Sequence, residues 1–126
     1  MKKGRTYGGV LLICGEKFLL GQRNKDGSFP NCWSLFGGKI EEGESILEGI
    51  KRELYEETGI KSDNIRYTPF EEQWGMGYPY HFFIGYCDEE YECKLNHENQ
   101  DWGWFDMDTI PKPLFPTLFS SLTRIF

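Results

Sequence analysis

Apolar residues at the start of the chain come in short runs that polar and turn-forming residues interrupt. Runs of this length, rich in aliphatic and aromatic residues, are typical of strands. They predict strands over residues 6–14, 18–22 and 33–36. The Gly15-Glu16-Lys17 segment separates the first two, so we expect a hairpin there, and we expect Gly37 and Gly38 to end the third strand.

The pattern changes to a helical one in the middle of the chain, over residues 44–58. Apolar side chains recur there at intervals of three and four positions, as they do on one face of an α-helix. These side chains are Ile46, Leu47, Ile50 and Leu54. Gly59 follows, and glycine is the residue that most often ends a helix. The pattern therefore predicts one amphipathic helix in this segment.

The second half of the chain is predicted to add three strands and one helix. The strands are expected over residues 65–74, 80–87 and 102–105, with the first two joined across a Gly75-Met76-Gly77 turn. A helix over 117–126 is expected to begin after a proline. Short strands around one well-marked helix, with a second helix at the end, predict an α/β or α+β sandwich.

The length of 126 residues fits one domain, which we expect to cover residues 1–126. No apolar run approaches the roughly 20 residues that a membrane-spanning helix needs, so a transmembrane role is excluded. The first apolar run leads into a charged turn at Glu16 and Lys17 instead of a cleavage site, so we expect a cytoplasmic protein. The four cysteines include no C-x-x-C pair, which favours free thiols over a zinc site.

The net charge of −6 argues against nonspecific binding to nucleic acid, because such binding needs a basic face. An acidic chain can still bind phosphate groups if cations mediate the contact. The charge therefore directs attention to clusters of acidic side chains that could hold a cation.

The predicted helix carries three glutamates on one face. With Glu53 at zero and about 100° per residue, Glu56 falls at about −60° and Glu57 at about +40°. The apolar face lies directly beside them, so we expect the acids at the edge of the core, facing a cleft. Carboxylates this close repel one another, and clustered carboxylates are ligands that Mg²⁺ or Mn²⁺ prefers. Gly49, one turn earlier, is expected to leave room for a metal ion and a phosphate group.

Arg52 lies on the same helix, four residues from both Glu48 and Glu56, and Glu44 lies one further turn toward the N-terminus. We interpret Arg52 and Glu44 as a scaffold that orients the carboxylates. The alternative is a charged helix face that is only solvated, which is common in proteins.

The loop before the helix favours the catalytic interpretation. Residues 38–60 read GKIEEGESILEGIKRELYEETGI. This stretch resembles the signature box of the Nudix hydrolases, and every fixed position of the box is filled, from Gly38 and Glu44 to Gly59 and Ile60. Residues 18–23, 33–38 and 98–105 resemble the family more loosely. Many members place a proline before the paired glycines, where this chain has Phe36.

The resemblance implies an α/β/α sandwich with a mixed β-sheet, in which a loop, the helix and the next loop bind Mg²⁺. Carried over position by position, it implies metal binding by Glu53, Glu56 and Glu57, joined by a backbone carbonyl of Gly37 or Gly38.

Members of the family often recruit a further acid from a downstream loop as a ligand or a base. Glu98 is the candidate here and Asp101 is the reserve, whereas His97 is interpreted as an exposed loop residue. A carboxylate that is not fully committed to the metal, Glu53 or Glu98, is expected to accept the proton of the attacking water. Glu57 is expected to act with them.

The implied reaction is the Mg²⁺-dependent hydrolysis of a diphosphate linkage, with Mn²⁺ as a substitute ion. Arg23 and Lys39 are candidates for phosphate contacts, although both fit surface charges equally well. The phrase WSLFGGKIE resembles members that hydrolyse oxidised nucleoside triphosphates. We therefore expect a nucleoside triphosphate, oxidised forms included, to be split into the monophosphate and pyrophosphate.

Other substrates and roles stay open. Tyr78 resembles a tyrosine of members that cleave dinucleoside polyphosphates, and an RNA 5′ end is a further alternative that the acidic charge disfavours. A ligand-sensing module without turnover is a different class, but such members usually lose box glutamates that this chain keeps. Six aromatic residues are candidates for stacking on a base or for the core: Tyr7, Tyr67, Trp74, Tyr78, Trp102 and Trp104.

Overall fold

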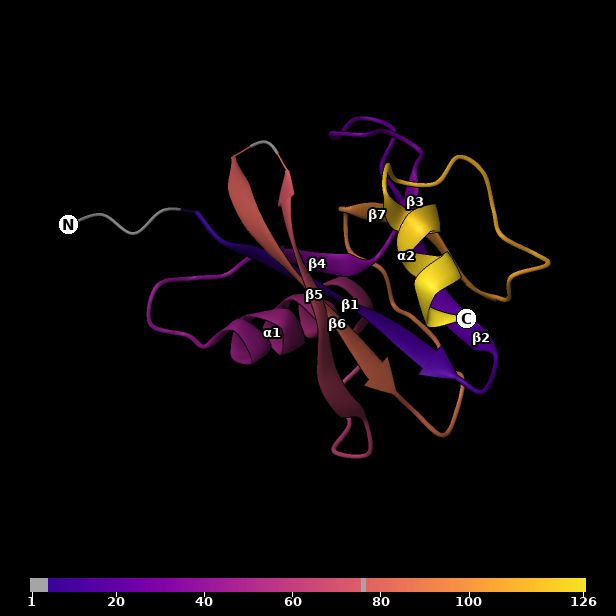
Figure 1. The fold of residues 1–126 in the computed structure, drawn as a ribbon, viewed down its shortest axis with the longest axis horizontal. Coiled ribbons are helices and arrows are strands. Elements are labelled where there is room, and N and C mark those ends of the chain that lie inside the picture. The colour runs from indigo at the N-terminus through magenta and orange to yellow at the C-terminus, as the bar shows by residue number, and fades with distance from the viewer. Residues whose placement is uncertain (1–4, 76) are drawn as a thin grey trace.

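The residues that the structure describes fold into one mixed β-sheet with two helices (Figure 1). The structure is a computed structural model that describes residues 5–75 and 77–126. The strands are β1 (Tyr7–Cys14), β2 (Lys17–Arg23), β3 (Trp33–Ser34), β4 (Phe36–Lys39), β5 (Arg66–Gly75), β6 (Tyr78–Tyr86) and β7 (Asn99–Phe105). The helices are α1 (Ile46–Thr58) and α2 (Leu118–Ile125).

The sheet is mixed because β1 and β6 run parallel while the other strand pairs run antiparallel. Its main path is β3-β2-β1-β6-β5, with β4 paired to β1 and β7 paired to β2. The β2–β7 pairing places the segment before β7 beside the β2–β3 loop, far away in sequence. These pairings set the positions of β4 and β7, which both contribute residues to the candidate site.

Each helix covers one face of the sheet. On one face, Val10 of β1 packs in a cluster with Ile50 and Leu54 of α1. On the other face, Leu11 of β1 packs in a cluster with Leu122 of α2. Successive side chains of a strand point to opposite faces, so a strand buried on both faces is apolar throughout, as β1 is. The expected α/β/α sandwich with a mixed sheet is confirmed.

The paired glycines do not end a strand as predicted. Gly37 and Gly38 lie inside β4, opposite Gly9 and Gly8 of β1. A Cβ atom at Gly37 would lie 2.2 Å from the backbone oxygen of Gly8. Glycine is found inside strands where another backbone approaches this closely. The prediction was wrong because it treated the glycines as turn formers and could not include this contact.

The starts of helix α1 and strand β7 also differ from the sequence-based prediction. Helix α1 begins at Ile46 because Ser45 caps it. The Ser45 side chain accepts a hydrogen bond from the backbone N–H of Glu48, and the Glu48 carboxylate accepts one from the backbone N–H of Ser45. Strand β7 begins at Asn99, three residues before the predicted start at Trp102. Met76 of the predicted β5–β6 turn lies outside the described residues.

None of the helices in the described ranges has the length and apolar character that crossing a membrane would require. The four cysteines, Cys14, Cys32, Cys87 and Cys93, are free thiols, as expected.

Helix α2 is attached to the sheet by a charged pair. The Arg124 guanidinium donates hydrogen bonds to the carboxylate of Glu71 on β5, and the Ser121 hydroxyl donates to the same carboxylate at 3.2 Å. The hydrogen bonds from Arg124 lower the pKa of Glu71 to about 2. The pair therefore ties the last helix to the edge strand of the sheet.

This pair predicts a pH-dependent stability. The folded-state pKa of Glu71 lies below its ordinary value of 4.5. The stabilisation of the fold by ionised Glu71 is therefore fully present above pH 4.5 and is lost as the pH falls toward about 2. Arg124→Ala should therefore lower the melting temperature at neutral pH and have little effect near the acid end. Thermal denaturation followed by circular dichroism, from neutral pH to about pH 2, measures the change in melting temperature. An equal effect of Arg124→Ala at every pH would contradict the pairing.

The matched control for this experiment is Arg66→Ala. Arg66 is also a β5 residue, and its guanidinium lies over the Tyr86 ring, 5.8 Å from the ring centroid. This contact involves no carboxylate, so the effect of Arg66→Ala on the melting temperature should not change between neutral and acid pH.

Candidate active site

Helix α1 carries the acids of the site on the edge of its buried face. The Ser45 cap fixes its start, and Gly59, with a positive φ of 75°, ends it. Ile50 and Leu54 are buried against the sheet, and Glu57 lies beside them with only 3% of its surface exposed. A glutamate this buried is rare unless it is paired or binds a metal.

Three carboxylates from two distant parts of the chain meet at this edge. Glu53 and Glu57 of α1 and Glu98 of the segment before β7 each offer one oxygen, and these oxygens lie within 4.8 Å of one another. The Glu98 backbone is held by two hydrogen bonds: its carbonyl accepts from Asn24 N at 3.0 Å, and its N–H donates to Asn96 Oδ1 at 2.9 Å. The structure thus brings together the three predicted catalytic acids.

Glu57 is the most enclosed member of the cluster. One of its oxygens accepts from the backbone N–H of Gly37 at 3.1 Å, and the other accepts from Asn99 Nδ2 at 3.1 Å. Burial, reinforced by the charges of Glu98 and Glu53, raises the pKa of Glu57 to about 9. The fold therefore brings together acids whose charged forms need a positive partner.

Glu53 lies against the second of the paired glycines. A Cβ atom at Gly38 would lie 2.7 Å from the carboxyl carbon of Glu53, so only glycine leaves room for this carboxylate. Arg52 Nη1 donates to Glu53 at 3.1 Å. Burial raises the pKa of Glu53, although Arg52 opposes that shift. Metal binding by the Gly37 or Gly38 carbonyl stays a prediction.

Arg52 connects the loop before α1 to the acids on α1. Its guanidinium donates two hydrogen bonds to Glu44, at 3.1 and 2.8 Å, and one to the carbonyl of Lys39 at 3.0 Å. It also donates to Glu53 and to Glu56. Its hydrogen bonds lower the pKa of Glu44. This geometry supports the predicted role of Arg52 and Glu44 as a scaffold.

Glu56 and Gly49 lie differently from the expectation. The Glu56 side chain is 51% exposed and forms an ion pair with Arg52 at 3.2 Å, and it is not part of the three-acid group found among the described residues.

A Cβ atom at Gly49 would meet Ile40 at 2.7 Å and Glu44 at 2.8 Å. The space beside Gly49 therefore holds these two side chains, and the expectation that it accommodates a metal ion with phosphate was wrong.

The predicted phosphate contacts are the last residues of two strands, β2 and β4. Arg23 donates from Nε to the Ser28 carbonyl and from Nη2 to the Ser28 hydroxyl, both at 2.7 Å, so its guanidinium is held by the 24–31 loop. Lys39 is exposed at the end of β4, directly after the paired glycines. Their contacts with phosphate stay predictions.

Asp101, the reserve acid, and His97 are close to Glu98 in sequence but do not belong to the three-acid cluster. Asp101 is exposed, and its carboxylate accepts from the N–H of Trp102 at 2.8 Å. His97 is exposed, as expected for a loop residue, and its carbonyl accepts from Asn24 Nδ2. Glu98 is therefore the downstream acid that reaches α1.

The aromatic candidates divide between core and surface. Trp102, Trp104 and Tyr67 pack against the cluster under α1. The Tyr7 and Tyr78 rings pack together at 5.9 Å between centroids, where β1 and β6 begin. The Trp74 side chain is exposed. Tyr78 therefore lies at the same end of the sheet as Lys39, which pairs with Tyr7 in the β1–β4 register.

Asn99 is a residue of the site that the sequence analysis missed. It is buried, with 8% of its surface exposed, and it holds Glu57 from the start of β7. The run Asn99-Gln100-Asp101 has low strand propensity, so it was assigned to a loop. The position directly after Glu98 was the only signal in the sequence.

The residues present fit a divalent metal ion. The donor atoms are carboxylate oxygens, which hard cations such as Mg²⁺, Mn²⁺ or Ca²⁺ prefer. A cation would also offset the burial and the mutual repulsion that raise the pKa values of Glu53 and Glu57. The observed set of ligand atoms thus matches a cation site in both chemistry and charge.

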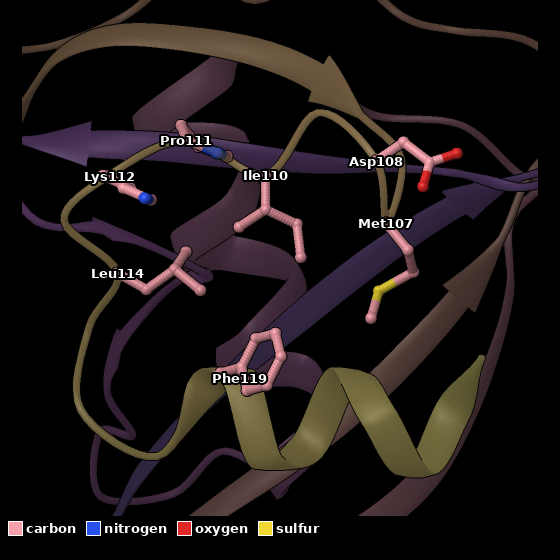
Figure 2. A pocket seen from close by; sticks show the side chains of 7 residues that line it. All are labelled: Met107, Asp108, Ile110, Pro111, Lys112, Leu114 and Phe119. Carbon is pink, nitrogen blue, oxygen red and sulfur yellow. The ribbon is translucent and has the colours of Figure 1, made fainter.

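A hollow elsewhere on the molecule contains none of the predicted site residues. It has a volume of about 380 Å³ and lies between the segment after β7 and helix α2 (Figure 2). Figure 2 shows Phe119 of α2 and Ile110 and Leu114 of the preceding segment around this space, with Lys112 and Asp108 farther out. Its lining is mostly apolar and includes none of the three acids of the cluster, so it is not the metal site.

The fold and the acid cluster together define a hydrolase of the Nudix type. The chain matches the NUDIX domain over residues 3–124 and therefore belongs to this family. It is 34% identical over 115 residues to the oxidized purine nucleoside triphosphate hydrolase of Mus musculus, covering 88% of this chain and 72% of that protein. The expectation of an enzyme of this family is confirmed.

Other relatives are longer proteins or share only the fold. The chain is 32% identical over 85 residues to the NAD-capped RNA hydrolase NudC of Chromobacterium violaceum, covering 65% of this chain and 31% of that protein. The structure of a MutT NUDIX hydrolase from Burkholderia pseudomallei is similar with a TM-score of 0.81, at 23% identity, covering 99% of this chain and 100% of that one. The Ap4A hydrolase of C. elegans gives a TM-score of 0.76 at 23% identity, covering 96% and 95%.

Proposed function

We propose that this protein hydrolyses nucleoside triphosphates, oxidised forms included, to the monophosphate and pyrophosphate with Mg²⁺ as cofactor. Mn²⁺ is the proposed substitute ion. The observation that carries the proposal is the convergence of Glu53, Glu57 and Glu98, whose oxygens lie within 4.8 Å of one another. The similarity to the mouse oxidized purine nucleoside triphosphate hydrolase, over 88% of this chain, supports the substrate class.

The roles of the residues follow from their burial. A bound divalent cation would offset the charge of the phosphate chain and make water a stronger nucleophile. Glu53, Glu57 and Glu98 would hold it, and Glu56 is the further ligand that the family pattern implies. Glu98 is the exposed member of the cluster, so it is suited to accept the proton of a water molecule from the solvent side.

The proposed reaction is a hydrolysis without a redox step. The water oxygen attacks a phosphorus atom, the anhydride bond to the leaving phosphate oxygen breaks, and the water proton passes to a carboxylate. Arg52 orients Glu53 through the hydrogen bond at 3.1 Å. Arg23, Lys39 and Tyr78 are the proposed substrate contacts.

Three alternatives are outcomes of the same assay. A ligand-sensing module without turnover is disfavoured because the chain keeps the box acids and the fold brings Glu53 and Glu57 together. Dinucleoside polyphosphates are an alternative suggested by Tyr78. An RNA 5′ end is disfavoured by the net charge of −6, which repels a polyanion. A cytoplasmic location and action on a small molecule stay predictions from the sequence.

A substrate panel tests the proposal directly. Purified protein with Mg²⁺ is incubated with ordinary and oxidised nucleoside triphosphates, dinucleoside polyphosphates and a 5′-triphosphorylated RNA, and the products are identified by mass spectrometry. We expect the fastest turnover, as kcat/KM, with a triphosphate, and the release of pyrophosphate. Turnover of none of these substrates, with the metal bound, would contradict the proposal.

The state of Glu57 predicts proton release when the metal binds. Its folded-state pKa of about 9 lies above the ordinary value of 4.5, so the metal-free folded protein keeps a proton between these values that the unfolded chain has lost. The stability of the metal-free protein should therefore fall as the pH rises through this window. A cation must displace the proton, so its affinity should rise with pH over the same window.

Calorimetry measures the released proton. Mn²⁺ is titrated at neutral pH in buffers of different ionisation enthalpy, and the dependence of the binding heat on the buffer gives the number of protons. We expect about one proton for the wild type and fewer for Glu57→Gln. Binding without proton release in the wild type would show that Glu57 does not carry the proton.

A further inference from the structure

The side chain of Asn99 joins strand β7 to the most buried acid of the site. Asn99 Nδ2 donates to Glu57 Oε1 at 3.1 Å, and both residues are buried, with 8% and 3% of their surfaces exposed. The other Glu57 oxygen accepts from the N–H of Gly37 at 3.1 Å. The carboxylate is thus held from two strands, β4 and β7, that flank it.

The amide of Asn99 packs against strand β2. A Cβ atom at Gly21 would lie 3.0 Å from Asn99 Oδ1 and 2.5 Å from the Phe36 ring, so Gly21 on β2 leaves the space that the amide and the ring occupy. With the oxygen packed over β2, the NH₂ group faces Glu57. For the ionised Glu57 that binds a cation, the opposite orientation would set an amide oxygen against a carboxylate oxygen, and two acceptors repel each other.

The backbone of Asn99 sets the position of a second acid. Asn99 pairs with Arg23 at an irregularity in the β2–β7 register, and the preceding residue, Glu98, accepts from Asn24 N at 3.0 Å. Glu98 is therefore placed by the strand that begins at Asn99. One residue fixes Glu57 through its side chain and Glu98 through its neighbouring backbone.

We propose that Asn99 is a positioning residue that orients Glu57 and sets its distance from Glu98 for binding a divalent cation. This inference rests on the proposed cation site and adds a residue outside the family box. Groups that hydrogen-bond to a metal ligand orient it, and their loss typically weakens metal binding about 10- to 100-fold. Asn99 faces Glu57 and not the solvent, so its effect on turnover is exerted through the acid.

The test measures Mn²⁺ binding of the folded protein, by the electron paramagnetic resonance signal of free Mn²⁺. Asn99→Leu keeps the number and branching of the side-chain heavy atoms without the donor, and Asn99→Ser shortens the side chain. We expect both variants to bind Mn²⁺ about 10- to 100-fold more weakly than the wild type, with kcat lowered and KM little changed. Asn64→Ser, at an exposed position, is the control and should bind Mn²⁺ as the wild type does.

A double variant separates positioning from a general effect on the fold. In a Glu57→Gln background, Asn99→Leu should not weaken the residual Mn²⁺ affinity further, because the amide acts through the carboxylate that is already lost. Wild-type affinity in a folded Asn99→Leu or Asn99→Ser variant would overturn the inference. If neither variant folds, Asn99 is a structural residue and the inference is also overturned.

Failure of the proposed cation site would give a different result from failure of the role of Asn99. If the wild-type protein binds no Mn²⁺, the cation site itself is refuted. If the wild type and Asn99→Leu bind Mn²⁺ equally and Glu57→Gln does not, the cation site stands and only the role of Asn99 is lost.

Discussion

Glu57→Gln is expected to lower turnover by several orders of magnitude while the protein stays folded. The substitution keeps the size of the side chain but removes a charged oxygen from the group that Glu53, Glu57 and Glu98 form. The glutamine oxygen can still accept one of the two hydrogen bonds, from Gly37 or from Asn99, whereas its NH₂ group must face the other donor. An unpaired buried donor costs about 1–3 kcal/mol.

A second effect of Glu57→Gln stabilises the metal-free protein and opposes that cost. Burial raises the pKa of Glu57 to about 9, so the wild type is destabilised at neutral pH by having to keep this acid protonated or charged inside the protein. Glutamine cannot ionise. The metal-free variant should therefore unfold at a temperature close to that of the wild type, and the Mg²⁺-induced rise in melting temperature should be largely lost.

Steady-state hydrolysis with saturating Mg²⁺, together with thermal denaturation with and without Mg²⁺, measures both effects. The control is Glu16→Gln, which makes the same change of charge at an exposed turn between β1 and β2. It should hydrolyse substrate at close to the wild-type rate. Turnover near the wild-type level in Glu57→Gln would refute the assignment of the site.

The acids of α1 could be predicted from the sequence because their positions follow from local periodicity. A helix over this segment is determined by its apolar spacing and by Gly59, and a period of about 3.6 residues then places Glu53 and Glu57 on one face. Glu98 was found through the family resemblance alone. Its approach to α1 depends on the pairing of β2 with β7, which no local pattern contains.

The partners of the charged groups could not be predicted in the same way. Spacing allowed Arg52 to pair with Glu48 or Glu56, but Glu48 is used in the cap of α1 and Arg52 reaches Glu44 and the Lys39 carbonyl. Those contacts depend on how the loop before α1 folds back over the helix. Asn99 was missed for a related reason, since its polar strand is formed only by pairing with β2.

The paired glycines show how one sequence feature can serve two physical roles. At Gly37 the nearest atoms to an added Cβ are backbone atoms of β1, the oxygen of Gly8 at 2.2 Å and the Cα atom of Gly9 at 2.5 Å. At Gly38 they belong to the end of the Glu53 side chain, at 2.7 Å and beyond. A strand backbone cannot move without breaking its pairing, whereas a carboxylate can turn away.

Alanine at these two positions is therefore expected to separate stability from metal binding. Gly37→Ala should destabilise the fold by about 3 kcal/mol, at the upper end for overpacked sites, because β1 and β4 must separate. Gly38→Ala should cost less stability but displace Glu53, and so weaken Mn²⁺ binding and turnover. Urea denaturation without metal gives the free energies of unfolding, and Mn²⁺ titration gives the affinities.

The control for both variants is Gly27→Ala, where the nearest atom to an added Cβ is the Asn24 oxygen at 3.7 Å, an ordinary contact distance. It should leave both stability and Mn²⁺ affinity close to the wild type. A Gly37→Ala protein as stable as this control would show that β1 and β4 have room between them. A Gly38→Ala protein with wild-type Mn²⁺ affinity would show that the position of the Glu53 carboxylate beside Gly38 is not the one that binds the ion.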